Sequence, residues 1–168
     1  MDENLAAALQ VAHVLDDLGL RWFLGGSLAS SIYGVPRATL DADLIADPRP
    51  AHVRPLLAAL GDDWYADENA IREAIVVRSS FNLISLSTAM KVDIFIAKAR
   101  PFEGGEFSRV QRKMIDQDGS FSIPVACAED TVVANLEWFR IGGEMSDRQW
   151  QDILGVRRFQ VTSSTSRS

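Results

Sequence analysis

The sequence has little of the chemistry that cross-links chains or binds soft metals. It contains one cysteine, Cys127, and two histidines among 168 residues. One thiol cannot form an internal disulfide, which fits a reducing cytoplasm, and zinc sites need more Cys and His ligands than this chain offers. No apolar run approaches the ~20 residues that span a bilayer, and the acidic start leads into an amphipathic helix rather than a secretory signal. We therefore expect a cytoplasmic protein without a membrane segment, in which Cys127 is an inert buried thiol.

A basic excess is also missing. The chain has 17 Lys and Arg against 23 Asp and Glu, a net charge of −6, and a pI of about 4.9. Proteins whose main task is to grip nucleic acid usually carry net positive charge. Two local basic strips remain, one with Arg109, Arg112 and Lys113 and the other with Arg157 and Arg158. We interpret both as solvated surface charge in preference to a nucleic-acid contact.

Hydrophobic periodicity and turn residues divide the chain into short elements within one domain. We expect helices over 4–19, 27–33, 50–60, 67–74, 129–140 and 146–158. We expect strands over 21–24, 38–46, 64–65, 76–77, 81–86, 90–96 and 120–126, a loop over 101–105 and a helix in the basic segment 107–114. Pro124 predicts that the strand over 120–126 lies at an edge of its sheet.

Two of these strands have one apolar face and one acidic face. Apolar residues alternate with Asp41 and Asp43 in the first, and with Lys91 and Asp93 in the second. Side chains alternate along a strand, so each can pack helices on one face and leave its acids open on the other. This predicts an α+β fold (α/β in a looser naming): a mixed β-sheet with helices packed on one face. We expect residues 1–126 to form the core, 127–160 a C-terminal helical segment packed on it, and 161–168 a disordered polar tail.

The acids themselves indicate a metal site. Asp is depleted in strands, and Asp41 and Asp43 repel each other on one face. Such a cost is usually tolerated where a cation neutralises the charge, so we favour metal ligation over a pair of surface acids, with Asp93 as the third ligand. Carboxylate oxygens suit Mg²⁺ or Mn²⁺. Lys91 shares the face of Asp93, where it contacts nucleotide or balances charge.

A glycine turn precedes the first acidic strand. Gly25 and Gly26 let the backbone approach a phosphate, and Ser27 adds a hydroxyl at a helix N-terminus. Arg37 and Thr39 lie on the face of the acids by alternation, so Arg37 is placed either to meet a phosphate or to form a salt bridge that orients Asp41. Together with the acids, this pattern predicts phosphoryl or nucleotidyl transfer. Metal ions held by the acids would clamp a triphosphate, and Asp93 would help to deprotonate the acceptor hydroxyl.

These motifs resemble the DNA polymerase beta-type nucleotidyltransferase superfamily, whose signature is a GG[ST] turn, an acid-x-acid strand and a third strand acid. The chain is most similar to small prokaryotic stand-alone members, such as the nucleotidyltransferase toxins of abortive-infection toxin–antitoxin systems, in which Arg-x-Thr-x-Asp-x-Asp is typical. Residues 37–43 fit that pattern, and the likeness covers roughly residues 5–156. It implies a nucleotidyltransferase fold and transfer of a nucleoside monophosphate from an NTP such as ATP. It leaves open whether the acceptor hydroxyl belongs to a tRNA, a protein or a small molecule, and it implies an antitoxin protein as a partner.

The chain departs from that group at two places. Asn135 stands where these proteins usually carry a lysine that can reach nucleotide phosphate, and the chain stops in a serine-rich tail where the group usually continues into further helices. The alternative is therefore a catalytically impaired nucleotide-binding or partner-binding module that retains the fold. A phosphohydrolase that uses the same acids is a weaker third possibility, because the glycine turn matches transferases.

Overall fold

A seven-stranded mixed sheet organises the computed structural model, which describes residues 3–34, 41–98, 101–115, 122–141, 150–151 and 153–156. The sheet order is β3-β4-β5-β2-β1-β7-β6. The strands are β1 (Trp22–Leu24), β2 (Asp41–Ala46), β3 (Trp64–Tyr65), β4 (Ser80–Ser85), β5 (Lys91–Ile96), β6 (Gln111–Met114) and β7 (Ser122–Val125). β2 pairs with β5 in parallel and β1 pairs with β7 in parallel, whereas the other neighbours are antiparallel.

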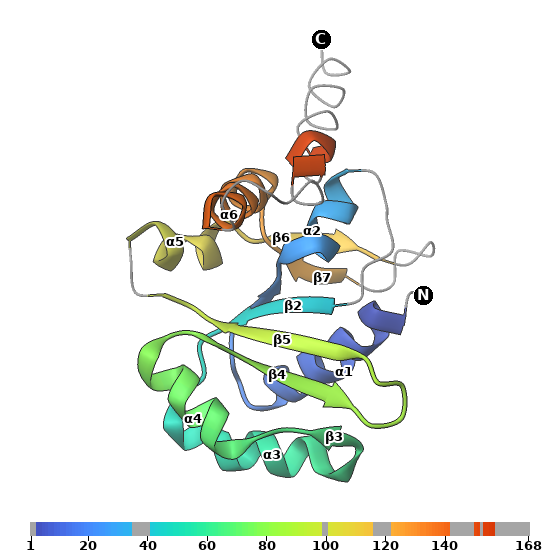
Figure 1. Cartoon of the computed structure of the whole chain (residues 1–168), viewed down its shortest axis with the longest axis vertical. Helices are drawn as coiled ribbons and strands as arrows, with labels where there is room; N and C mark the ends of the chain where they lie inside the picture. The colour runs from blue at the N-terminus through green and yellow to red at the C-terminus, as the bar shows by residue number, and fades with distance from the viewer. Residues whose placement is uncertain are drawn as a thin grey trace.

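Helices pack against this sheet. They are α1 (Glu3–Asp17), α2 (Gly26–Tyr33), α3 (Val53–Leu60), α4 (Glu68–Val77), α5 (Pro101–Arg109) and α6 (Ala128–Ile141), with single turns η1 (Pro50–His52) and η2 (Gly61–Asp63). Figure 1 shows α3 and α4 side by side near β3 and β4, and α2 and α6 side by side at the opposite end of the molecule. None of the helices in the described ranges has the length and apolar character needed to cross a bilayer.

The apolar faces of β2 and β5 form the centre of the core. Leu44 of β2 and Ile94 of β5 are fully buried, and α1, in which Val11 and Leu15 are also buried, packs on both strands. α3 packs on α1 and α4, and α4 packs on β4. Asp67 caps α4, because its carboxylate accepts a hydrogen bond from the backbone N–H of Ala70 at 3.0 Å. The α+β class and the mixed sheet are confirmed.

One predicted strand is part of a helix. Val76 and Val77 form the last turn of α4, where their side chains are 76% and 61% exposed. The preference of valine for strands is weak and can be overridden by the surrounding structure. Here α4 continues through both valines and ends at Arg78, which adopts the left-handed conformation at φ 52°.

The segment 101–114 also differs from the prediction. Residues 101–105 were expected to be a loop, yet they begin α5, with Pro101 at the first helical position, where its fixed φ is favourable. The helix ends at Arg109, and residues 111–114 form strand β6 because they pair with β7. The prediction of a helix over 107–114 is therefore wrong beyond Arg109.

The position of Pro124 was predicted wrongly as well. β7 lies between β1 and β6, and the edge strands of the sheet are β3 and β6. The ladder between β7 and β1 is a single residue pair, Leu24 with Val125. Because that ladder is so short, the missing N–H of Pro124 costs little inside the sheet.

The C-terminal part is described only in pieces. α6 agrees with the predicted helix over 129–140, and residues 150–151 and 153–156 are helical within the predicted 146–158. The tail over 161–168 lies outside the described residues. The division into a core, a helical segment and a tail stays a prediction.

Candidate active site

The three predicted acids lie at neighbouring positions on one face of the sheet. In the parallel pairing of β2 and β5, Asp41 lies opposite Lys91, and Asp43 lies opposite Asp93. Along both strands buried and half-buried residues alternate, with all four of these side chains in the half-buried set. Adjacent strands are about 5 Å apart, so the four form a compact array that carries three carboxylates and one ammonium.

Lys91 lies between two of the acids. Its Nζ is 3.0 Å from Asp93 Oδ2 and 3.7 Å from Asp41 Oδ1. The hydrogen bond to Asp93 is the largest reason why the pKa of Lys91 is raised above its ordinary value. Lys91 is therefore charged at neutral pH, and in this structure it balances charge, one of the two roles expected for it. Within the described ranges, no group of three His, Cys, Asp or Glu side chains converges closely enough to hold a metal ion.

Asp43 is the most perturbed of the acids. Its pKa is raised from 3.8 to about 6, first by burial and then by the negative charges of Asp93 and Asp41. The charge of Lys91 and a hydrogen bond from the Ser27 backbone N–H oppose this rise without cancelling it. Because the array holds three carboxylates and one ammonium, its own cation does not neutralise all of its charge, which is typical of a site that receives a further cation.

The glycine turn packs directly against Asp43. Gly25 N–H donates to the backbone oxygen of Asp43 at 2.9 Å. Gly26 has φ +58°, and a Cβ added there would lie 1.7 Å from Asp43 Oδ2. Glycine is therefore required at position 26 for both conformation and space. Since Ser27 N–H bonds the same carboxylate, the N-terminus of α2 is directed at the acid array.

The predicted phosphate-binding residues are only partly placed by the structure. Gly25, Gly26 and Ser27 lie at the acids, as described above. Arg37 and Thr39 lie outside the described residues, so their phosphate contacts stay predictions.

The acid-bearing face extends across β4 and β3, which was not predicted from the sequence. Asn82 lies opposite Asp93, Ile84 lies opposite Lys91, and Tyr65 of β3 lies opposite Ile84. Asn82 is exposed and Tyr65 is 53% exposed. Alternation in β4, where Phe81 and Leu83 are buried, was the available signal, although it does not show which strand lies beside β5.

Asn135 is buried at the contact of α6 with α2. Its side-chain Nδ2 donates to Ser30 Oγ at 2.8 Å, and Ser30 Oγ donates to the backbone oxygen of Gly26 at 3.1 Å. This polar chain links α6 to the glycine turn. Asn135 therefore supports the glycine turn at Gly26 through hydrogen bonds.

The first basic strip is engaged within the protein. Arg109 forms an ion pair with the nearly buried Asp130 at 2.9 Å, and Arg112 bonds both Oγ and the backbone oxygen of Ser122. The Lys113 ammonium lies 4.8 Å from the centre of the Tyr33 ring. These contacts favour a structural interpretation of the strip. Arg157 and Arg158 lie outside the described residues.

Cys127 agrees with the expected inert thiol. It is 5% exposed, and burial is the largest reason why the pKa of its thiol is raised. A thiol whose pKa is raised forms little reactive thiolate at neutral pH.

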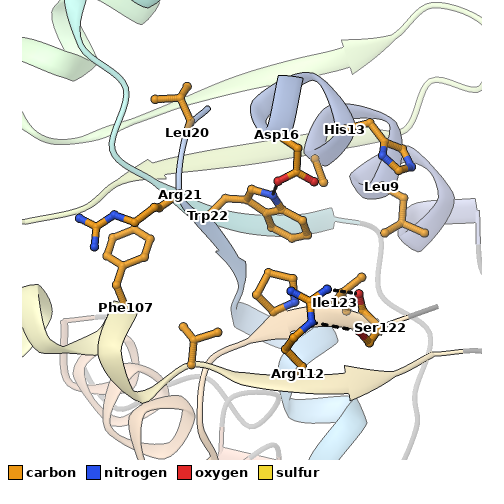
Figure 2. A pocket seen from close by; sticks show the side chains of 13 residues that line it. Leu9, His13, Asp16, Leu20, Arg21, Trp22, Phe107, Arg112, Ser122 and Ile123 are labelled. Atoms are coloured by element: carbon orange, nitrogen blue, oxygen red, sulfur yellow. Dashed lines mark hydrogen bonds between the residues drawn. The ribbon is translucent and has the colours of Figure 1, made fainter. Parts of the chain in front are cut away.

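A cavity of about 390 Å³ lies apart from the acids, between α1, β1, α5, β6 and β7. Figure 2 shows Trp22 Nε1 donating to Asp16 on one wall and Arg112 held by Ser122 on the other. Its lining includes none of Asp41, Asp43 and Asp93. The acids instead lie on the half-buried face of β2 and β5, outside this cavity.

No protein-family model matches this sequence, and no curated protein matches it. Solved structures do resemble it over nearly their whole length. Lincosamide antibiotic adenylyltransferase LnuA, with lincomycin bound, has a TM-score of 0.60 and 12% identity, covering 95% of this chain and 98% of that one. A Thermotoga maritima protein named provisionally as a nucleotidyltransferase, TM1012, has a TM-score of 0.55 and 17% identity, covering 89% and 94%.

A third structure is that of the antibiotic-resistance factor ANT(2″)-Ia, with a TM-score of 0.55 and 11% identity, covering 99% of this chain and 93% of that one. Identities this low establish a shared fold rather than a shared reaction. The sheet and helices described above are accordingly those of a nucleotidyltransferase fold.

Proposed function

We propose that this protein is a divalent-cation-dependent nucleotidyltransferase that moves a nucleoside monophosphate from an NTP to a hydroxyl group. The observation that carries the proposal is the pairing of Asp43 with Asp93 on parallel strands, with the Gly26 turn packed against Asp43. Binding a metal-complexed triphosphate requires a helix N-terminus beside neighbouring carboxylates of this kind.

The residues present fit Mg²⁺ or Mn²⁺. The donors are hard carboxylate oxygens, and the three carboxylates share one lysine ammonium, so their negative charge is only partly balanced. Asp41, Asp43 and Asp93 would hold the metal, which when bound neutralises charge on the phosphates and the leaving group.

The chain's own residues account for the remaining steps. Gly25, Gly26 and Ser27, with Arg37 and Thr39, orient the triphosphate, and Asp93 accepts the proton of the acceptor hydroxyl. The acceptor oxygen forms a bond to the α-phosphorus while the bond from the α-phosphorus to the bridging oxygen breaks, and pyrophosphate leaves.

We place the acceptor on the open side of β4 and β3, beside Asp93. This surface carries the Asn82 amide and the exposed Tyr65 ring. A small hydroxylated molecule is favoured over an RNA, because the chain is acidic and its first basic strip is engaged internally. LnuA has an antibiotic bound, which agrees with an acceptor of that size. A toxin that modifies a tRNA or a protein under the control of an antitoxin is the alternative setting, supported by the 37–43 motif.

The second candidate function is a nucleotide- or partner-binding module without turnover. Asn135 favours it, because the amide that replaces the group's usual lysine is buried in the α2–α6 contact. The retention of three carboxylates on one face favours the enzyme.

Calorimetric titration with ATP, CTP, GTP and UTP in the presence of Mg²⁺ tests the proposal, with Asp41→Ala/Asp43→Ala as the control. We expect one or more NTPs to bind only with Mg²⁺, and the double variant to lose that binding. Pyrophosphate release with candidate hydroxylated acceptors then tests turnover. Binding without turnover supports a nucleotide-binding module, and an absence of NTP binding contradicts the enzyme and favours a partner-binding module.

A further inference from the structure

The acid array contains a cation of its own. Lys91 is directly opposite Asp41 across the β2–β5 ladder, and Asp93 is two residues further along the same face of β5. The Lys91 ammonium reaches both carboxylates, at 3.0 Å from Asp93 Oδ2 and 3.7 Å from Asp41 Oδ1. It therefore lies between a carboxylate from each strand.

We propose that Lys91 is a built-in competitor for the divalent cation, which must displace the Lys91 ammonium from Asp93 before all three carboxylates can act as ligands. The inference rests on the proposed function for the use of a metal. It adds a control step within the same site, namely exchange of an internal ammonium for an external cation.

The two ion pairs differ in strength, because their exposure differs. The Asp93 side chain is 19% exposed and the Asp41 side chain is 49% exposed. The pair with Asp93 is thus shorter and better shielded from water, whereas a pair as exposed as that with Asp41 contributes little. Displacement of Lys91 is therefore opposed mainly at Asp93.

Asp43 differs from the other two acids in what it contacts. It accepts a hydrogen bond from the Ser27 backbone N–H, whereas Lys91 forms its ion pairs with Asp93 and Asp41. A cation can therefore approach Asp43, next to the glycine turn, before Lys91 moves, and Asp93 joins the ligand set when Lys91 leaves it.

The lysine stem allows this exchange. Lys91 carries its ammonium on a flexible four-carbon chain, and the side chain is 36% exposed. Once released, the ammonium remains on the open face of the sheet, where a triphosphate would lie. Lys91 would then first be released from Asp93 and afterwards contact a phosphate.

The primary test measures Mn²⁺ affinity without nucleotide, from the electron paramagnetic resonance signal of free Mn²⁺. Lys91→Met removes the ammonium and keeps the length of the stem, so we expect Mn²⁺ to bind about tenfold more tightly, the effect of relieving two partly exposed ion pairs. Lys91→Arg keeps the charge and should stay closer to wild type than Lys91→Met. Arg72→Met is the matched control, because it removes the same charge from an exposed pair with Glu68 on α4.

A second measurement uses the wild-type chain and does not depend on how the variants fold. Acetic anhydride acetylates the neutral amine of a lysine, so a lysine whose ammonium form is stabilised by ion pairs reacts more slowly, and mass spectrometry reports the rate at Lys91. We expect Mg²⁺ to accelerate acetylation of Lys91 and to leave the rates of the other lysines unchanged.

The outcomes separate this inference from the proposed function. Equal or weaker Mn²⁺ binding by Lys91→Met, or an acetylation rate at Lys91 that Mg²⁺ does not change, overturns the inference while nucleotidyl transfer by the wild type still stands. Failure of both wild type and Lys91→Met to bind Mn²⁺ overturns the inference together with the metal dependence on which it rests.

Discussion

At the scale of single residues, the candidate site depends on a glycine that packs too closely against Asp43 for any larger residue to fit. Gly26 combines a positive φ with a position where its missing Cβ leaves room for Asp43. Gly19 has a similar φ of +69°, yet a Cβ added there would meet nothing within 4 Å. The chain therefore offers two glycines that share a backbone conformation and differ in what surrounds them.

Comparison of Gly26→Ala with Gly19→Ala separates these two effects. Gly19→Ala should cost about 1 kcal/mol of unfolding free energy from backbone strain alone and leave Mn²⁺ binding intact. Gly26→Ala should cost more and weaken Mn²⁺ binding by about tenfold or more, because the Asp43 carboxylate must move from its place beside the turn. Urea denaturation and Mn²⁺ titration of both variants measure this. Equal Mn²⁺ affinities would contradict the contact between turn and carboxylate.

At the scale of secondary-structure elements, α2 is held between the acid-bearing strands and α6. Its first turn packs on Asp43 of β2, and its second turn receives the Asn135 amide through Ser30. Because Ser30 Oγ also donates to Gly26 oxygen, a change on α6 is transmitted to the turn that supports the carboxylates.

A double-mutant cycle on Ser30 and Asn135 tests this link. Each single change to alanine should lower the unfolding free energy by about 1–2 kcal/mol, since it leaves a buried partner without its hydrogen bond. The double variant should lose less than the sum, with a coupling energy of about 1 kcal/mol. Urea denaturation of the four proteins measures the cycle, and simple additivity would show that the two side chains do not act through each other.

At the scale of the whole molecule, the candidate site opposes stability. Three carboxylates and one ammonium lie together on a chain whose net charge is already −6. In the unfolded chain Asp43 titrates near 3.8, and in the folded protein near 6. Folding therefore binds a proton between these pH values, and stability falls as the pH rises through that window.

Asp43→Asn should relieve this penalty. Without divalent metal, we expect the variant to be about 2 kcal/mol more stable than wild type at pH 7, because the neutral amide has no charge to desolvate and can still accept from Ser27 N–H. The gain should shrink as the pH falls from 6 and vanish below about pH 4, where wild-type Asp43 is protonated in both states. Denaturation curves from pH 4 to 7.5 check this. A gain independent of pH would exclude the titration of Asp43 as its cause.

Local pattern in the sequence by itself determined the elements that carry the site. Alternation predicted which faces of β2 and β5 hold the acids, and the pair Gly25–Gly26 predicted the turn before α2, because both signals depend on residues adjacent in the chain. Local preference was insufficient at Val76–Val77 and at 101–105, where the helices run further than their residues suggest. The prediction that the strand of Pro124 lies at an edge was wrong, because an edge position depends on which strands become neighbours in the sheet.

Only the tertiary structure decided which residues of the site lie opposite one another. β2 and β5 are separated by η1, α3, η2, β3, α4 and β4, and their register sets Asp43 opposite Asp93 and Lys91 opposite Asp41. The burial of Asn135 likewise depends on α6 reaching α2. Residue identities and spacing determine which chemical groups a strand can present, whereas distances between groups on different strands follow from a pairing that no local segment encodes.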